Sequence, residues 1–560
     1  MVRRLLKRLA APVRGMHRAA YLLAAFTLAS QLLALLRDRT FARIFGAGQT
    51  LDLYYAAFKV PDLVFALVSS LVSAYILIPY ILSTSREETG ALLSESLSFL
   101  AIGGGLICLT LAIFAPHVLF AIYPKFANSP QRAEFILLAR VLLLQPILLG
   151  ISGVLGSVTQ VEQQFFLFAL APVLYNLGII FGTVVLYPVY GLPGIGYGVV
   201  GGAVLYVATN IPAVLRSGIR IRPSWPRLSM MLPIVRDSIP RSLAIGMDSF
   251  TLLFLTALAA RLSSGSVSVF TLASNLENVP LALVGGSYAV AAFPALSKNA
   301  FTNRDAFTRI LSSSARHIIL WSMVFLGLIV VLREYLVRVI LGSGAFDWNA
   351  TRLTAALLAL FVVGLAAQGL VLLFFRALYA VKQSWRPFMY QLGAAALTIL
   401  ASLFFLTPWA RSTFAFWLSS MLNISSTSDS LVLMLAFAAT LGEVFLAAWS
   451  TYALREAAPG LAQSLVRPLF QGTLAAAAAG TAGYTTLLLL GGLSSLDSPR
   501  TVLAHGLVGG VIGLAVAALS LALMKNEEFV DIRKAFSRLV QSRAPLAVMR
   551  PSAPEERIRN

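Results

Sequence analysis

Apolar segments long enough to cross a lipid bilayer recur along almost the whole sequence. This recurrence limits the possible folds more than any other feature, because a helix needs about 20 predominantly apolar residues to span the hydrocarbon layer. Only 12% of the 560 residues are charged and the mean hydropathy is +0.83, whereas soluble domains are roughly one quarter charged. The chain is therefore an integral membrane protein, and no segment has the period-two alternation of a membrane β-strand.

The sequence predicts an all-α polytopic membrane protein with about 14 transmembrane helices in two six-helix lobes plus a terminal helix pair. The spans are expected near 19–37, 54–82, 92–123, 134–160, 166–187, 193–215, 240–261, 268–294, 315–341, 353–380, 388–407, 430–453, 468–491 and 503–524. The predicted divisions are a basic cytoplasmic arm (1–18), an N-terminal lobe (19–215), a basic cytoplasmic linker (216–239), a C-terminal lobe (240–453), helices 13 and 14 (466–524) and a basic cytoplasmic tail (525–560).

The net charge of +20 first suggests nucleic acid as a partner, but its distribution argues against that partner. Most Lys and Arg residues lie before the first span, after the last span, or in loops that follow even-numbered spans. This alternation is the positive-inside pattern, so we expect both termini in the cytoplasm. The basic tail is expected to lie against anionic membrane lipids.

Residues for catalysis or metal binding do not cluster in the sequence. Cys108 is the single cysteine and the four histidines are scattered, so neither a disulfide nor a metal site is expected. No GxxxxGK[ST] segment is present that would hold ATP. A membrane glycosyltransferase would need catalytic acids on a large extracytoplasmic loop, and the longest such loop, 408–429, carries only two charges. We therefore predict that the protein is not an enzyme and has no cofactor.

Charged residues concentrate between the first two predicted spans, in SQLLALLRDRTFARIFGAGQTLDLYYAAFKVPD. A charge at the centre of a membrane helix costs about 2.5–3.5 kcal/mol on insertion scales, so such groups normally face a water-filled cavity or a partner. Arg37, Asp52 and Lys59 therefore indicate the wall of a polar chamber. The alternative, which applies best to Arg39 and Arg43, is that the basic residues cap the helix end at the lipid surface.

Two carboxylates lie within apolar segments: Asp248 in IGMDSFTLL and Glu443 in ATLGEVFLAAW. Intramembrane carboxylates often mark ion or proton pathways, so both are candidates for ion coupling. Alternatively, Glu443 is a packing residue whose carboxylate accepts hydrogen bonds from neighbouring hydroxyls. Arg261 and Arg376 are further basic groups that could either face the chamber or cap helix ends.

Several motifs resemble the MviN/MurJ family. Arg37-Asp38, followed by FARIFGAGQTLD and AFKVPDL, is similar to the first two helices of that family. SSGSVSVF at 263–270, AVAAFPALSK at 289–298 and FRALYAVKQSWRPF at 375–388 are similar to later segments. The resemblance covers the first eleven predicted helices, and its 14-helix architecture matches the one expected from hydropathy.

The resemblance implies a function. Members of the family flip the undecaprenyl-linked peptidoglycan precursor, lipid II, across the bacterial inner (plasma) membrane. The implied substrate is a lipid-linked sugar pyrophosphate, which the flippase would move by alternating access. Arg37, Asp52 and Lys59 stand on matching positions and would bind this substrate, because arginine in particular forms bidentate bonds with phosphate.

The family also suggests how transport could be driven. Some members bind sodium through an Asp on helix 7, a place that Asp248 fits. Gln391 is the nearest polar group to the ligands that the family carries on helix 11, so the set is incomplete. Coupling to sodium, to a proton or to the membrane potential therefore remains open, as does pairing of Asp248 with a basic group.

This sequence departs from the family at cavity arginines. Gln31 replaces one in helix 1, Phe65 and Ala66 replace a pair in helix 2, and Asn275 replaces one in helix 8. A doubly charged headgroup would thus have fewer partners. The departures keep three alternatives open: export of another lipid-linked oligosaccharide, export of an amphipathic cation, or a non-transporting membrane scaffold.

Overall fold

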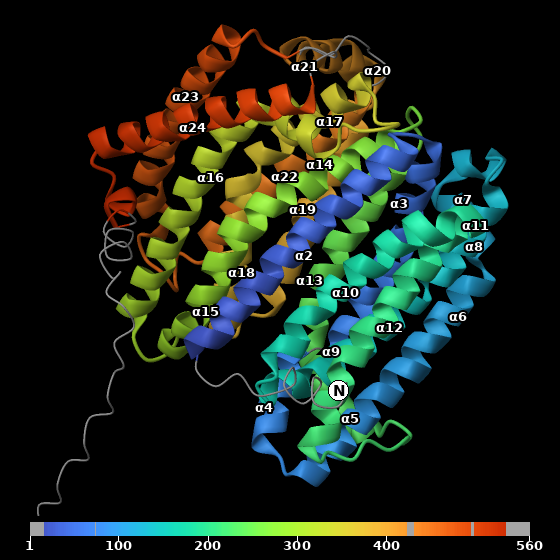
Figure 1. The fold of residues 1–560 in the computed structure, drawn as a ribbon. Coiled ribbons are helices and arrows are strands. Elements are labelled where there is room, and N and C mark those ends of the chain that lie inside the picture. Colours follow the sequence, from blue (N-terminus) through green and yellow to red (C-terminus); the bar gives the residue numbers. More distant parts are fainter. Residues whose placement is uncertain (1–15, 73, 423–429, 494–497, 532, 534–560) are drawn as a thin grey trace, which may run out of the picture.

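The computed structural model describes residues 16–72, 74–422, 430–493, 498–531 and 533. Most of the predicted basic arm and of the basic tail lies outside the described residues. All regular elements of the described part are helical, which confirms the all-α prediction (Figure 1). Following the predicted division, we call α2 to α12 the N-terminal lobe and α13 to α22 the C-terminal lobe.

Among the described residues, the N-terminal lobe contains eleven α-helices and four short 3-10 or π segments. In chain order they are α2 (Met16–Phe45), α3 (Gln49–Val68), η1 (Ser69–Val72), α4 (Ala74–Ser83), α5 (Arg86–Phe99), η2 (Leu100–Gly104), α6 (Gly105–Ile113), α7 (Ala115–Ile122), η3 (Pro124–Asn128), α8 (Arg132–Leu142), α9 (Leu144–Val161), α10 (Phe165–Phe181), η4 (Gly182–Leu186), α11 (Tyr187–Tyr190) and α12 (Leu192–Ser217).

The C-terminal lobe follows, and two long helices are added to it. Its elements are α13 (Leu228–Ala259), α14 (Ser266–Leu281), η5 (Ala282–Gly286), α15 (Ser287–Asn299), α16 (Arg304–Ile340), α17 (Trp348–Val363), α18 (Leu365–Ala380), α19 (Trp385–Phe405), α20 (Pro408–Ala410), η6 (Arg411–Ala415), α21 (Phe416–Met421) and α22 (Leu431–Ala453). The added pair is α23 (Leu461–Leu489) and α24 (Pro499–Leu523).

Eleven continuous helical stretches of the described chain are long and apolar enough to cross a membrane, or twelve with α17 and α18 as one span bent by 46°. The bend falls at Gly364. α2 and α23, with 30 and 29 residues, are outside that count. The predicted total of 14 spans therefore stays a prediction, whereas the multi-span character is confirmed.

Several helices are longer than their apolar windows. α13 begins at Leu228 rather than at 240, and α16 begins at Arg304 rather than at 315. Hydropathy marks only the part of a helix that lies in hydrocarbon, so it misses amphipathic turns that continue into the interface. The predicted linker is correspondingly shorter in the structure.

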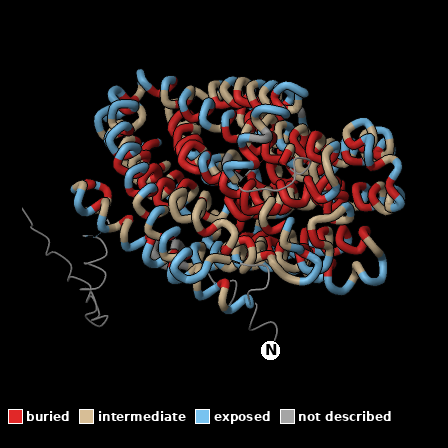
Figure 2. Tube along the Cα trace, turned by 90° about the horizontal axis from the view of Figure 1, so that it is seen from above, coloured by how far each residue is buried: buried red, intermediate tan, exposed pale blue. Residues whose placement is uncertain are grey.

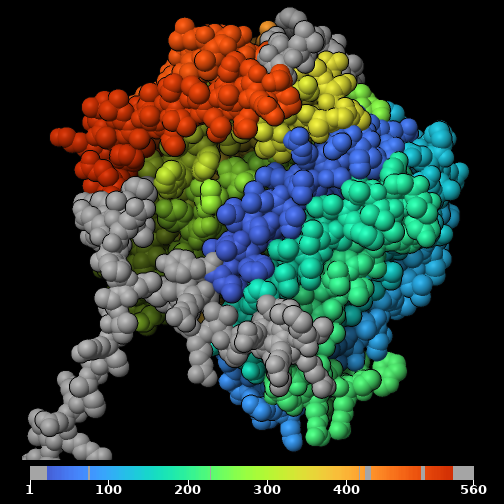
Figure 3. All heavy atoms as spheres, viewed as in Figure 1, coloured from blue at the N-terminus to red at the C-terminus, as the bar shows by residue number. Residues whose placement is uncertain are grey.

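The two lobes lie side by side, and α2 runs diagonally over the boundary between them (Figures 1 and 3). α2 packs along α10, while α3 packs against α13 and α14 of the other lobe. Buried residues gather inside both bundles, and exposed residues line their periphery (Figure 2). α23 and α24 pack on each other and on α16 at one edge of the C-terminal lobe.

Glycines allow α10 and α12 to approach closely. A Cβ on Gly198 of α12 would overlap the backbone of Gly178 on α10 and of Gly182, the first residue of η4. Small residues four apart are typical of such membrane helix contacts. Gly201, on the exposed side of α12, has no atom within 4 Å of the same hypothetical Cβ.

The segment 218–227, which connects the two lobes, is hydrogen-bonded to the N-terminal lobe. The backbone N–H of Arg222 donates to Oγ of Ser94 at 3.0 Å. Arg227 donates from its backbone N–H to buried Glu95 at 3.1 Å and from its Nε to the same carboxylate at 2.7 Å. The linker is therefore held along α5.

The beginning of α13 is also fastened to the N-terminal lobe, although the rest of the helix belongs to the C-terminal lobe. Ser238 Oγ donates to the carbonyl of Leu71 at 2.6 Å, and the hydroxyls of Ser70 and Ser242 are 2.7 Å apart. Further along, α13 packs on α19. One helix thus contacts both lobes.

Candidate functional site

Arg37 belongs to a polar network that connects both lobes to α2. Its Nη2 lies 2.9 Å from Oδ1 of Asp38, and its Nη1 donates to Oδ1 of Asn176 on α10 at 3.3 Å. The other oxygen of Asp38, a buried residue, accepts from Nδ2 of Asn275 on α14 at 2.9 Å. Asn275, which replaces a family arginine, therefore serves as a partner of Asp38.

Asp52 caps the first turn of α14 from the opposite lobe. Its buried carboxylate accepts from the backbone N–H of Gly265 at 2.7 Å, from that of Ser268 at 2.8 Å and from the Ser268 hydroxyl at 2.6 Å. A carboxylate is favourable there because the helix N-terminus carries unsatisfied N–H groups and the positive end of the dipole. In this conformation Asp52 joins the lobes.

Further contacts join the lobes at the same end of the molecule. The backbone N–H of Ala345 donates to the carbonyl of Arg43 at 3.0 Å, and Arg39 donates to the last carbonyls of α16. Lys125 donates to the carbonyl of Leu262 in the turn before α14. Arg39 thus caps α16 rather than its own helix, and the lobes are closed at this end.

The remaining predicted substrate residues lie apart from one another. Lys59 is half-buried on α3 and interacts electrostatically with Asp62 and, across the lobes, with Asp248. Arg261 is exposed in the turn after α13, and Arg376 is half-buried on α18, where it donates to the carbonyl of Leu372 at 3.3 Å. The structure does not gather Arg37, Asp52 and these three into one pocket.

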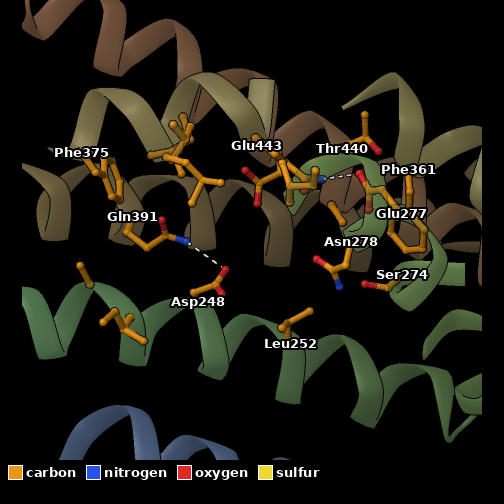
Figure 4. Close-up of a pocket in the computed structure, with 18 of the residues that line it drawn as sticks. Asp248, Leu252, Ser274, Glu277, Asn278, Phe361, Phe375, Gln391, Thr440 and Glu443 are labelled. Carbon is orange, nitrogen blue, oxygen red and sulfur yellow. Dashed lines mark hydrogen bonds between the residues drawn. The ribbon is translucent and has the colours of Figure 1, made fainter. Parts of the chain in front are cut away.

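A cavity of about 360 Å³ lies inside the C-terminal lobe, and we call it the acidic cavity. Three carboxylates line it: Asp248 of α13, Glu277 of α14 and Glu443 of α22 (Figure 4). None of the described residues that line it is Lys or Arg. The cavity is therefore suited to a cation rather than to a phosphate.

Amides satisfy two of these carboxylates. Gln368 on α18 donates to Oε1 of Glu277 at 2.8 Å, and Gln391 on α19 donates to Oδ1 of Asp248 at 3.5 Å (Figure 4). Glu443 has no hydrogen-bond or ion-pair partner among the described residues. It lines the cavity together with the other two (Figure 4), so the site retains a carboxylate without a partner among the described residues.

Glu277 was absent from the predicted site. It lies in SNLENVP within an apolar span, the same signal that singled out Asp248 and Glu443. Glu277 is distant in sequence from Asp248 and Glu443, so the sequence did not show that the three belong together. They form one group because α13, α14 and α22 line the same cavity. Ser274, Asn278 and Thr440 complete the polar lining.

Two apolar cavities lie beside α16, and together we call them the apolar groove. One cavity of about 270 Å³ lies between α16 and α24, and another of about 210 Å³ lies between α16, α14 and α2. Leu336 lines both. Both are lined almost entirely by aliphatic and aromatic residues, so they can accept hydrocarbon.

Two helical lobes with a polar interior and an apolar groove beside them define a multi-span membrane transporter. Residues 41–490 match the family described as Lipid II flippase MurJ. The chain belongs to this family, which is one of flippases and not of enzymes. The predicted resemblance is thereby confirmed.

Curated relatives agree with this assignment. A protein of Burkholderia cenocepacia named Lipid II flippase MurJ is 24% identical over 405 residues, which cover 70% of this chain and 78% of that protein. A Thermotoga maritima protein named Probable lipid II flippase MurJ is 26% identical over 376 residues, covering 67% of this chain and 76% of that protein.

Solved structures confirm the fold. The structure titled Lipid II flippase MurJ, inward closed conformation, superposes with a TM-score of 0.70 at 18% identity and covers 90% of this chain and all of that one. An inward-facing multidrug resistance MATE family transporter of the MOP superfamily superposes with a TM-score of 0.62 at 15% identity, covering 77% of this chain and 96% of that one.

Proposed function

We propose that this protein translocates lipid II across the bacterial inner membrane by alternating access. The family match over residues 41–490 is the observation that carries the proposal. The closed contacts around Asp52 and Arg39 support it, because alternating access requires one end to be closed while the other admits substrate. We place both termini in the cytoplasm from the distribution of basic residues, with the basic tail against anionic lipids.

Within this proposal Arg37 and Lys59 hold the pyrophosphate, because Arg37 is linked to α14 through Asp38 and Lys59 interacts electrostatically with Asp248 of the opposite lobe. The side chain of Arg37 is 20% exposed, and Asp38 and Asn176 fix its orientation. The polyprenyl tail stays in the apolar groove beside α16. That groove is formed partly by α24 of the terminal helix pair.

Complementation tests the function directly. A bacterial strain depleted of its own lipid II flippase is expected to grow when it expresses this chain. Growth should require Arg37, so Arg37→Ala serves as a matched negative control. If the chain is correctly inserted and abundant but neither supports growth nor flips lipid II in vesicles, the proposal is wrong.

We further propose that a sodium ion or a proton in the acidic cavity couples to transport. Three carboxylates and no lining Lys or Arg support a monovalent cation at this place. Asp248→Asn, Glu277→Gln and Glu443→Gln should each reduce the dependence of flipping on that ion. Glu134→Gln is the control, because Glu134 accepts from the N–H of Leu192 within the N-terminal lobe. If the ion dependence of flipping is unchanged in all three variants, the acidic cavity is not the coupling site.

The acidic cavity also favours one alternative, export of an amphipathic cation. The two functions differ in a simple measurement: a cationic dye should be expelled from cells only under the alternative. Loss of dye export in Glu443→Gln, together with failure to complement, would select the alternative over lipid II transport.

A further inference from the structure

Two charged residues stand next to each other near the end of α16, away from both sites described above. Arg333 and Glu334 precede the end of the helix at Ile340 by seven and six residues, which corresponds to about 10 Å along the axis. Both line a cavity of about 200 Å³ that α16 forms with Tyr484 and Leu488 of α23. This headgroup cavity, as we call it, shares no residue with the acidic cavity.

The two charges do not neutralise each other. Neighbouring residues on a helix point in different directions and do not face each other. Arg333 donates to the carbonyl of Val330 in its own helix at 2.6 Å. Glu334 has no hydrogen bond and no ion pair with any described residue. A cation and an anion are thus presented separately to one cavity within an apolar surface, where unsatisfied charge is costly.

The surroundings of the cavity indicate a ligand that comes from the bilayer. Tyr484 and Leu488 are each 56% exposed and Leu489 is 89% exposed. Tyrosine is enriched at the membrane interface, where its ring is in an apolar region and its hydroxyl is near polar groups. The volume is below the roughly 300–1,000 Å³ of pockets that enclose whole small molecules. A lipid headgroup would fill it while the acyl chains remain outside on α23.

We propose that the headgroup cavity binds a zwitterionic phospholipid that carries a primary amine, of the phosphatidylethanolamine type. Arg333 binds the phosphate and Glu334 accepts hydrogen bonds from the ammonium, so that each charge of the lipid has one partner. Phosphatidylglycerol offers no cation to Glu334. Phosphatidylcholine has a quaternary ammonium without N–H donors and is bulkier. The charge pattern therefore favours the ethanolamine headgroup over both.

The bound lipid would connect α16 with the terminal helix pair. α16 and α23 already touch closely, since a Cβ on Gly327 would overlap the backbone of Ala476. A lipid between Arg333 and Tyr484 extends that contact to the end of both helices. The proposal does not depend on which substrate the lobes transport.

Lipid binding to the full-length protein tests the proposal. The protein is delipidated in detergent and titrated with phosphatidylethanolamine, phosphatidylglycerol or phosphatidylcholine, and bound lipids are counted by native mass spectrometry. We expect one phosphatidylethanolamine to bind about tenfold more tightly than the other lipids, the effect of one charge-assisted hydrogen bond. Equal affinities for all three lipids would overturn the proposal.

Charge variants make the test specific. Arg333→Ala should lower the affinity for phosphatidylethanolamine about tenfold, whereas Glu334→Gln should remove the preference over phosphatidylglycerol. Arg338→Ala is the control, because Arg338 lies on the same helix and stacks on Trp348 outside the cavity. An unchanged preference in Glu334→Gln contradicts the proposal. Arg333→Lys keeps the charge and should keep the preference for phosphatidylethanolamine. Binding by this variant would show that the loss in Arg333→Ala comes from the missing charge and not from misfolding.

Discussion

A single amide changes the balance of charge between the lobes. The family carries an arginine where Asn275 lies, and an arginine there would offer a cation to the chamber. Asn275 instead donates a neutral hydrogen bond to Asp38, whose other oxygen neutralises Arg37. Under the proposed function, the substrate would compete with Asp38 for Arg37, and its binding would depend strongly on that one guanidinium.

Arg37→Ala is expected to abolish transport at normal expression, because it removes a charge-assisted bond of about 1.5–3 kcal/mol. Arg37→Lys should restore transport only in part, since an ammonium cannot form the bidentate contact with phosphate. Flipping of lipid II in vesicles measures both. Arg39→Ala, which removes one of several contacts that join the lobes at α16, should retain transport. Normal flipping by correctly inserted Arg37→Ala would exclude a substrate role for Arg37.

Asp52→Asn is expected to weaken closure of the lobes, because a neutral amide accepts less strongly from the N-terminus of α14. A cysteine at Ala47 should then react faster with a membrane-impermeant thiol reagent. Asp347→Asn is the control, since Asp347 caps α17 within one lobe by accepting from Ala350 at 2.7 Å. Equal labelling rates in the two variants would show that Asp52 does not hold the lobes together.

The helices themselves were largely predictable, and their interruptions were not. Apolar windows identify membrane helices because hydrocarbon tolerates few unsatisfied groups. The π segment at Ala282–Gly286 and the bend at Gly364 each lie inside a single predicted apolar window, so hydropathy does not mark them, and the packing of these helices on distant segments does not appear in the sequence. The grouping of Glu277 with Glu443 depends on the same packing, so the candidate residues could be found singly but not assembled.

Gly198→Ala should destabilise the contact of α12 with α10, since overpacking typically costs about 1–3 kcal/mol. The melting temperature in detergent should therefore fall. Gly201→Ala makes the same chemical change on the exposed side of α12, and it should be neutral or slightly stabilising because alanine is the better helix former. Equal melting temperatures would show that the close helix contact contributes nothing to stability.

At the scale of the molecule, the orientation in the membrane is a prediction from the distribution of basic residues. Cysteines at Ser85, Ser229 and Ala457 should not react with a membrane-impermeant thiol reagent added outside, whereas cysteines at Gln49, Ser263 and Ser425 should; Ser425 lies outside the described residues. The positive-inside distribution is the reason. A reversed labelling pattern would show that the protein has the opposite orientation in the membrane. A mixed pattern would show that the predicted number of spans is wrong.

α13 has a mechanical consequence for the whole transporter. Its first turns and the linker before it are bound to the N-terminal lobe through Ser238 and Ser242, so they travel with that lobe. Pro240 removes one helical hydrogen bond within this bound part of α13. If the lobes rotate against each other, as the proposed alternating access requires, α13 bends beyond Ser242, in the stretch that leads to Asp248. Ala244 and Asp248 of this stretch line the acidic cavity, so the shape of that cavity changes with the rotation.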